Sequence, residues 1–249
     1  MNDSLLPFTS DQPDRPDLRT HYDAMWTGAW PHVATGAVDL ETHLTGGRDP
    51  GRGLTVIARP GPALAARCGA VQDRIVAAGG PAQIPQAQAD LHLTVLSLFS
   101  VTEEFAPHLA YLDGYAAGTR AAVAGLPAFD VDFTGITISR GAVVACGFPR
   151  DDTLAVLRSR LRDALRARGL GATLDQRYRL VTAHMTLVRF TAPPRDPARM
   201  ASALADLRDA PLGTMRVDAL ELVVNDWYMS SEALEVVERL ALTGPDGDG

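Results

Sequence analysis

Apolar positions along the chain follow two different spacings, and each change of spacing marks a new element. Leu54–Ala58 (LTVIA) is a short apolar run that ends at Pro60, which is typical of a buried strand. Between residues 64 and 75, apolar side chains recur every three or four positions and predict one face of a helix that ends at Gly79. Residues 91–99 (LHLTVLSLF) again have the pattern of a strand. This part of the chain therefore predicts strand, helix and strand.

The middle of the chain predicts a further helix and then a hairpin. A helix is expected over residues 102–124, with Thr102 as its N-cap. Residues 131–139 and 142–148 are strand-like runs joined by a turn at residues 140 and 141. The inward face of the first run changes phase near Gly135, which indicates a β-bulge.

The second half repeats this order of elements. A leucine stripe, a strand that carries a histidine, a short helix and two closing strands follow the hairpin. The chain is therefore predicted to be an α+β protein with two pseudo-symmetric lobes. Each lobe would be a mainly antiparallel sheet with flanking helices, and the active-site cleft would lie between them. The elements expected here are helices over 154–165 and 198–207 and strands over 180–190, 215–224 and 234–242.

The N-terminal part lies outside this repeat. Residues 1–52 are expected to form an N-terminal extension, in which a polar tail precedes a helical cap over 16–34. Residues 53–249 are expected to form the two-lobed domain. Its lobes would be about 53–141 and 142–249, with elements that the lobes can exchange.

Two of the predicted strands carry the same polar pattern. His92 and Thr94 lie in the sequence HLTV, and His184 and Thr186 lie in HMTL. Residues i and i+2 of a strand point the same way, so each strand presents an imidazole and a hydroxyl on one face while the apolar residues face the core. Two such strands facing each other would surround a small anionic group with two imidazoles and two hydroxyls.

A single His-x-Thr on a strand face is weak evidence, because both residue types are common on exposed strands. A third copy, at His43, provides an internal comparison: two glycines follow it, and it lies in no strand-like run. We interpret that copy as coincidence. The two copies at equivalent places of a repeat are instead interpreted as functional.

Composition and charge exclude several classes of function. The net charge is −7, and all 23 basic residues are arginines, so mechanisms that need a lysine nucleophile or a P-loop lysine are excluded. The acidic balance argues against binding of long duplexes. No apolar run approaches the roughly 20 residues of a membrane span, and no secretory signal begins the chain. We therefore expect a cytoplasmic monomer without a membrane partner, with Cys68 and Cys146 as buried thiols rather than a disulfide.

The paired motifs resemble those of the 2H phosphoesterase superfamily, which includes RNA 2′,3′-cyclic phosphodiesterases, once called 2′-5′ RNA ligases. The resemblance covers roughly residues 53–242 and is strongest at the two motifs. Arg189 also matches the form His-x-Thr-Leu-x-Arg of the second motif in bacterial members. Residues 1–52 have no counterpart in the common core of the superfamily.

This resemblance implies catalysis by His92 and His184, one as general base and one as general acid, and the residue chemistry supports it. Opening a 2′,3′-cyclic phosphate needs a base for water and an acid for the departing ribose oxygen, and imidazoles serve both roles near neutral pH. Thr94 and Thr186 can donate hydrogen bonds to the non-bridging oxygens. Neither a metal nor another cofactor is expected, because two histidines without an acidic cluster make a poor divalent-cation site.

Other residues have alternative interpretations. Arg189 could bind phosphate. Strict alternation along the strand, however, places its side chain on the face that points away from His184, unless a bulge intervenes. Tyr178, between two arginines, could stack on a nucleobase or lie in an exposed loop. Tyr228 could cover a base or pack at a rim. The arginines at positions 158, 160, 162, 166 and 168 lie largely off the leucine stripe and are interpreted as a solvated helix face.

The sequence thus predicts a metal-independent phosphodiesterase that acts on a nucleotide or an RNA terminus. The alternative is a binding module for nucleotides or RNA ends that has the same pocket and no turnover. A metal-dependent phosphatase is a third interpretation. The physiological diester, the position of the product phosphate and the assignment of acid and base to the two histidines stay open.

Overall fold

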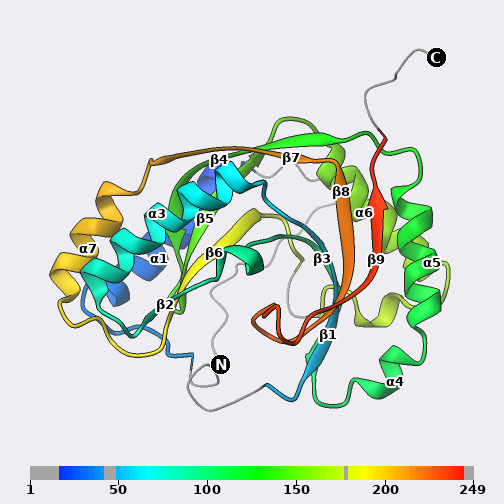
Figure 1. Cartoon of the computed structure of the whole chain (residues 1–249), viewed down its shortest axis with the longest axis horizontal. Helices are drawn as coiled ribbons and strands as arrows, with labels where there is room; N and C mark the ends of the chain where they lie inside the picture. The colour runs from blue at the N-terminus through cyan, green and yellow to red at the C-terminus, as the bar shows by residue number, and fades with distance from the viewer. Residues whose placement is uncertain (1–16, 42–48, 177–178, 244–249) are drawn as a thin grey trace.

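The computed structural model describes residues 17–41, 49–176 and 179–243, and it shows an α+β fold built on two antiparallel sheets (Figure 1). The α-helices are α1 (Leu18–Val33), α3 (Pro62–Gly79), α4 (Ala106–Leu109), α5 (Leu112–Val123), α6 (Thr153–Arg166) and α7 (Pro197–Asp206). The strands are β1 (Arg52–Ala58), β2 (Gln83–Pro85), β3 (Leu93–Thr102), β4 (Phe129–Ile138), β5 (Ala142–Pro149), β6 (Ala183–Phe190), β7 (Pro211–Val217), β8 (Ala219–Asn225) and β9 (Glu235–Ala241). Short 3₁₀ turns cover Gln88–Asp90 and Gly171–Thr173.

The two sheets exchange elements between the halves of the chain. Sheet A has the order β3-β1-β8-β9, so its last two strands come from the C-terminus. Sheet B has the order β2-β6-β5-β4-β7, so β2 and β4 come from the first half. The two motif strands lie in different sheets and contact each other where the sheets meet. The exchange therefore holds the two halves together as one core.

The helices divide between the two sheets. α5 and α6 pack against each other beside sheet A, where α6 also contacts β3 (Figure 1). α3 and α7 pack together beside sheet B, where α3 contacts β2, β6 and β7. Apolar side chains from both sheets and from these helices join in one main core cluster. Burial of this shared core positions the two motif strands.

The N-terminal helix α1 confirms the helix expected over residues 16–34 and packs on sheet B. Its Tyr22 side chain is 1% exposed and contacts the ring of Phe148 at a centroid distance of 5.5 Å. The Thr137 hydroxyl donates to the Tyr22 carbonyl at 2.8 Å. Register places Thr137 beside Val144 and, across β5, beside Thr186, so α1 covers the sheet face on which His184 lies.

The structure divides two of the expected elements and adds a third that was not expected. The helix over 102–124 is divided into α4 and α5, and Thr102 is the last residue of β3, which pairs with Arg52. The strand over 215–224 is divided into β7 and β8, which belong to different sheets. β2 was not expected, since three residues are too few to show a period. The bulge expected near Gly135 is present as a register shift between Phe133 and Ile136.

Both cysteines are buried free thiols, as expected. Among the residues described, no helix has the length and apolar character needed to cross a bilayer.

Candidate active site

The two motif strands present their histidines at the junction of the sheets. His92 directly precedes β3, and His184 is the second residue of β6. Both side chains are partly exposed, while Leu93 and Met185, which alternate with them, are completely buried. The charge of His92 contributes to the pKa of His184, so the two imidazoles lie within electrostatic range of each other. The fold therefore brings the two motifs together.

A β-bulge follows the threonine of each motif at the same position. Opposite β1, Val56 pairs with Leu96 and Ile57 pairs with Thr94, so Val95 is the extra residue. Two successive residues of β5, Val143 and Val144, pair with Val188 and Thr186 of β6. Leu187 is therefore the extra residue on β6. Each bulge shifts the alternation by one residue. Residues five after each histidine, Ser97 and Arg189, consequently return to the histidine face.

This bulge settles the orientation of Arg189. The alternation of buried and exposed residues along β6 shifts by one position at the bulge. Leu187 and Val188 are both completely buried, and Arg189 is partly exposed like His184 and Thr186. The charge of Arg189 lowers the pKa of both His92 and His184, as expected for a guanidinium on their side of the strand. The structure therefore has the bulge that an inward Arg189 requires. Its counterpart on β3 is the small neutral side chain of Ser97.

A buried arginine on α6 ties the two motif strands together. The guanidinium of Arg158 donates to the carbonyl oxygens of Val95 and Thr94 on β3, at 2.8 and 3.1 Å. It also donates to the carbonyl oxygens of Val181 and Thr182, just before β6, at 3.0 and 2.7 Å. One planar cation with several donors thus fixes the distance between the strands.

The expected solvated arginine face of α6 is therefore wrong for two positions. Arg158 and Arg162 are each 5% exposed, and Arg162 forms a bidentate ion pair with Asp175. A signal was present in the sequence: Arg158 follows Leu154 by four residues and precedes Leu161 by three, so it continues the apolar face. Arg160, Arg166 and Arg168 are exposed, as expected.

The two imidazoles have different partners at Nδ1. Nδ1 of His92 lies 2.7 Å from the carbonyl oxygen of Asp90. A carbonyl only accepts hydrogen bonds, so this Nδ1 carries a proton, and Nε2 of the neutral ring carries a lone pair that can accept. Nδ1 of His184 lies 2.7 Å from the hydroxyl of Thr182, which can donate or accept. The sequence pattern Thr-x-His-x-Thr could have pointed to Thr182, because it shares the face of His184.

Burial lowers the pKa of both histidines to about 4. For His92, the charges of Arg59 and Arg189 add to the desolvation and outweigh the hydrogen bond to Asp90. For His184, the charges of Arg158, His92, Arg189 and His21 add to it. Desolvation and nearby cations both disfavour the protonated ring, so both imidazoles are neutral at pH 7.

Helix α1 is anchored directly beside His184. The Tyr22 hydroxyl donates to the Gly147 carbonyl at 3.2 Å and accepts from the amide of Ala183 at 3.1 Å. Ala183 immediately precedes His184, so the N-terminal extension supports the second motif strand. Sequence reasoning identified the helix but gave no role to Tyr22.

Arg189 lies in a small polar cluster with Glu41 and Tyr228. Its Nη1 is 3.7 Å from Oε1 of Glu41, and its guanidinium lies 5.4 Å from the centre of the Tyr228 ring. The Tyr228 hydroxyl donates to Oε2 of Glu41 at 3.1 Å, and the residue is 7% exposed. This burial favours rim packing for Tyr228 over a nucleobase contact. Trp227, at 38% exposure, is the exposed aromatic of that turn.

Two other sequence candidates lie outside the described residues. Tyr178, a predicted nucleobase contact, and His43, the third His-x-Thr copy, are not described by the structure.

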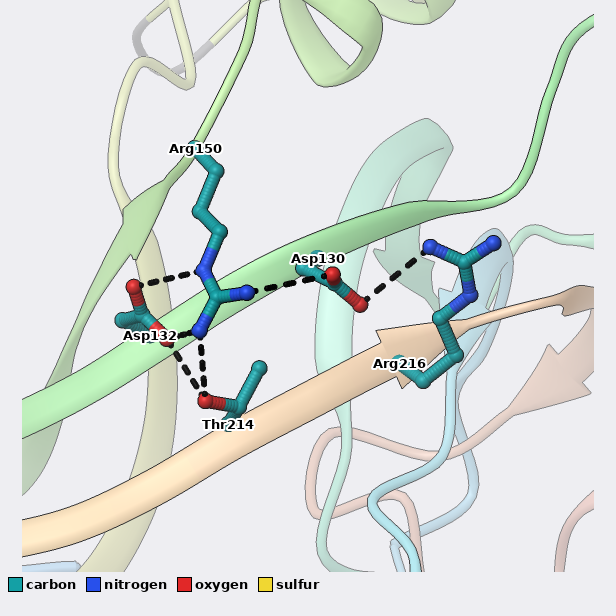
Figure 2. Close-up of polar contacts among 5 residues, drawn as sticks. All are labelled: Asp130, Asp132, Arg150, Thr214 and Arg216. Carbon is teal, nitrogen blue, oxygen red and sulfur yellow. Dashed lines mark hydrogen bonds and ion pairs between the residues drawn. The ribbon is translucent and has the colours of Figure 1, made fainter. Parts of the chain in front are cut away.

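A second polar cluster lies on sheet B, on β4 and β7 and at the end of β5. Arg150 pairs with Asp130 and Asp132, and Arg216 pairs with Asp130 (Figure 2). The Thr214 hydroxyl donates to Asp132 at 2.6 Å. Arg150 is 53% exposed and its partner carboxylates are partly exposed, so this is a surface ion-pair network that joins β4, β5 and β7. Its charges compensate one another, and we assign it no part in the site.

Within the described part of the chain, no group of three or more His, Cys, Asp or Glu side chains has an arrangement that could hold a metal ion. The polar groups of the site are instead imidazoles, hydroxyls and a guanidinium. This donor set favours an anion.

Comparisons with known proteins identify the family and the fold of the chain. The sequence model of the 2′-5′ RNA ligase superfamily matches residues 60–228, which include both motifs. TT0787 of Thermus thermophilus is 18% identical over 78% of this chain and 100% of its own, with a TM-score of 0.58. A conserved protein of unknown function from Agrobacterium tumefaciens is 17% identical over 85% of this chain and 97% of its own, with a TM-score of 0.53. E. coli LigT in complex with NADP+ is 17% identical over 77% of this chain and 98% of its own, with a TM-score of 0.50. No protein of curated function matches the chain.

Proposed function

The chain belongs to the 2′-5′ RNA ligase superfamily of 2H phosphoesterases, and from this premise we propose that it is a metal-independent phosphodiesterase. Its substrate would be a 2′,3′-cyclic phosphate or a related phosphodiester of a nucleotide or RNA end. One observation carries the proposal: two neutral imidazoles, supported on matching bulged strands, have different hydrogen-bond partners at Nδ1.

The difference at Nδ1 supports a division of roles between the histidines. Because Nδ1 of His92 donates to Asp90, its Nε2 lone pair is available, and His92 serves as the general base for water. The bound phosphodiester anion raises the pKa of His184 and so favours its imidazolium form, in which Nδ1 donates to the Thr182 hydroxyl and Nε2 carries the proton that makes His184 the general acid.

The proposed step balances in protons and bonds. Water attacks phosphorus and transfers a proton to Nε2 of His92, while the bond from phosphorus to one ribose oxygen breaks. That oxygen receives the Nε2 proton of the His184 imidazolium, which becomes a neutral imidazole, and the product is a phosphate monoester next to a free hydroxyl. A later proton exchange with solvent restores both rings.

The remaining groups would hold the phosphate. Thr94 and Thr186 share the faces of the histidines and can donate to the non-bridging oxygens, where negative charge increases in the transition state. Arg189 can add a charge-assisted hydrogen bond from the β6 side. Tyr178 stays a proposed nucleobase contact, whereas the burial of Tyr228 leaves it a supporting role.

A turnover assay in EDTA tests the proposal. The purified chain is incubated with 2′,3′-cyclic nucleotides and short RNAs ending in a cyclic phosphate, and the product phosphate is located by ³¹P NMR. Hydrolysis that persists in EDTA is expected. Binding of the diester without turnover would favour the binding module, and turnover that EDTA abolishes would favour a metal-dependent phosphatase.

A further inference from the structure

A carboxylate from the N-terminal extension reaches the site. The segment 37–41 runs beside sheet B, where the amide of Asp39 donates to the Arg140 carbonyl at 2.9 Å and the amide of Glu41 donates to the Phe190 carbonyl at 2.8 Å. Phe190 directly follows Arg189, so this backbone contact brings the Glu41 side chain to the guanidinium. Residue 41 precedes the part of the chain that matches the superfamily.

The contacts of Glu41 are those of a fixed, partly buried charge. Its side chain is 23% exposed, that of Arg189 is 18% exposed, and the charged atoms are 3.7 Å apart. The Tyr228 hydroxyl holds the other carboxylate oxygen. The 3.7 Å separation is longer than a hydrogen bond, so Glu41 offsets the charge of Arg189 without occupying Nη1 as a donor.

The other charged groups near Glu41 and Arg189 do not replace Glu41 as the ion-pair partner of Arg189. Arg189 is influenced by Glu41, Tyr228 and Asp226, and Tyr228 is influenced by Glu41, Arg189 and Asp49. Asp226 and Asp49 have partners of their own in Tyr228, Ser230, Gly51 and Trp227. Glu41 is thus the carboxylate that forms an ion pair with Arg189.

A negative charge at this place acts differently on substrate and product of the proposed reaction. A cyclic phosphodiester carries one negative charge, and the monoester that forms from it carries about two at pH 8, because its second pKa is near 6. Coulomb repulsion by one fixed carboxylate is proportional to the ligand charge, so the dianion is repelled about twice as strongly. A phosphate site without this carboxylate would bind the dianionic product more tightly relative to the substrate.

We propose that Glu41 is a specificity-determining residue that makes the site prefer monoanionic phosphodiesters to dianionic phosphomonoesters, and so favours product release. This inference rests on the proposed function of the site. It assigns a role to the N-terminal extension that the shared core of the superfamily lacks.

The test compares equilibrium binding of two ligands at pH 8. Glu41→Gln removes the charge and keeps an oxygen that accepts from the Tyr228 hydroxyl. Calorimetry measures the Kd of a nucleoside 3′-monophosphate, and the KM and initial burst rate report on the 2′,3′-cyclic nucleotide. Asp39→Asn is the matched control, since it removes one carboxylate and one ion pair, with Arg140, from the same segment.

The variant is expected to bind the monophosphate about tenfold more tightly and to change the KM for the cyclic diester by about threefold or less. Asp39→Asn should leave both values unchanged. Equal changes for the two ligands, no change, or weaker binding of both would overturn the proposal, and weaker binding would show that Glu41 only holds Arg189 in place. A wild-type chain that neither binds nor cleaves the diester would overturn the proposed function itself, and the selectivity of Glu41 with it.

Discussion

β3 and β6 carry the same motif with the same bulge, yet their surroundings differ. Both present a histidine, a threonine and, five positions after the histidine, a third polar residue on one face. On β3 that third residue is Ser97, whose hydroxyl donates to the Phe99 carbonyl at 3.2 Å. On β6 it is Arg189, and α1 and Glu41 support that strand from both ends.

This comparison shows how a duplicated support can give an asymmetric site. The shared features, the bulge and the contacts to Arg158, fix where the two imidazoles lie. The features that differ, the Nδ1 partners and the single guanidinium, decide proton positions and charge. The duplication thus supplies geometry, and the differences supply direction to the proposed reaction.

The largest effects are expected from the groups that the two strands share. His92→Ala or His184→Ala should each lower kcat by about 10²–10⁴-fold, the usual contribution of a general acid or base. Stability should change little, since both side chains are partly exposed. Steady-state kinetics and denaturant unfolding of the same preparations measure both quantities.

His43→Ala is the control for these variants and should leave activity unchanged. Substantial loss there would mean that the wrong copy of His-x-Thr was dismissed. Loss at only one of the two motif histidines would contradict the division into base and acid.

The lowered histidine pKa values predict an acid-sensitive fold. Each ring has a pKa of about 4 in the folded chain and an ordinary value of 6.5, so the unfolded chain binds more protons between these pH values. The stability contribution is complete above pH 6.5 and is lost as pH falls towards 4, by about 1–3 kcal/mol per ring.

Unfolding in urea from pH 7.5 to 4.5 measures this slope, and His92→Gln or His184→Gln should reduce it. Inorganic phosphate should raise the pKa of both rings in ¹H–¹⁵N NMR titrations, because an anion between them favours their protonated forms. Rings that titrate near 6.5 without phosphate would contradict the burial that the structure shows.

Removing the hydrogen bonds of Arg158 between the two strands is expected to lower stability more than it lowers activity. Arg158→Met removes the donor that serves two carbonyl groups on β3 and two just before β6, and it should lower the free energy of unfolding by about 2–3 kcal/mol. Arg160→Met is the matched control, because Arg160 is an exposed neighbour on the same helix. Equal effects of the two variants would show that the contacts of Arg158 contribute nothing specific.

The asymmetry of the third polar position can be tested directly. Arg189→Ala should lower kcat/KM by about 10- to 100-fold, because hydrogen bonds to charged groups contribute roughly 1.5–3 kcal/mol. Ser97→Ala, the equivalent change on β3, should have an effect of less than about threefold. Similar losses at the two positions would mean that both strands bind the phosphate in the same way.

The smallest effect is expected at Thr182, whose hydroxyl is the Nδ1 partner of His184 and can be removed by mutation. Thr182→Val keeps the shape of the side chain and removes the hydroxyl beside His184, so kcat should fall by about three- to tenfold. Thr182→Ser should restore most of the activity. The equivalent partner of His92 is a backbone carbonyl, which no substitution at position 90 removes, and Asp90→Asn should therefore leave the acid limb of the pH profile unchanged.

The sequence determined the elements and the two motifs, because both depend on local periodicity. Alternation alone placed each histidine with its threonine, and it showed that Arg189 could face inward only past a bulge. A stripe of leucines predicted α6, and a cluster of aromatics predicted α1. These signals are local in the chain, so they can be recognised without knowledge of neighbours.

The tertiary structure decided everything that depends on contacts between distant segments. It placed Arg158 between two strands that are far apart in the sequence, although the residue type alone suggested a solvated face. It brought Glu41 of the extension to Arg189, and it gave each imidazole its own Nδ1 partner. Periodicity reports which face of an element is buried, but the partner of a buried polar group is set by the packing of whole elements, and only the folded chain specifies that packing.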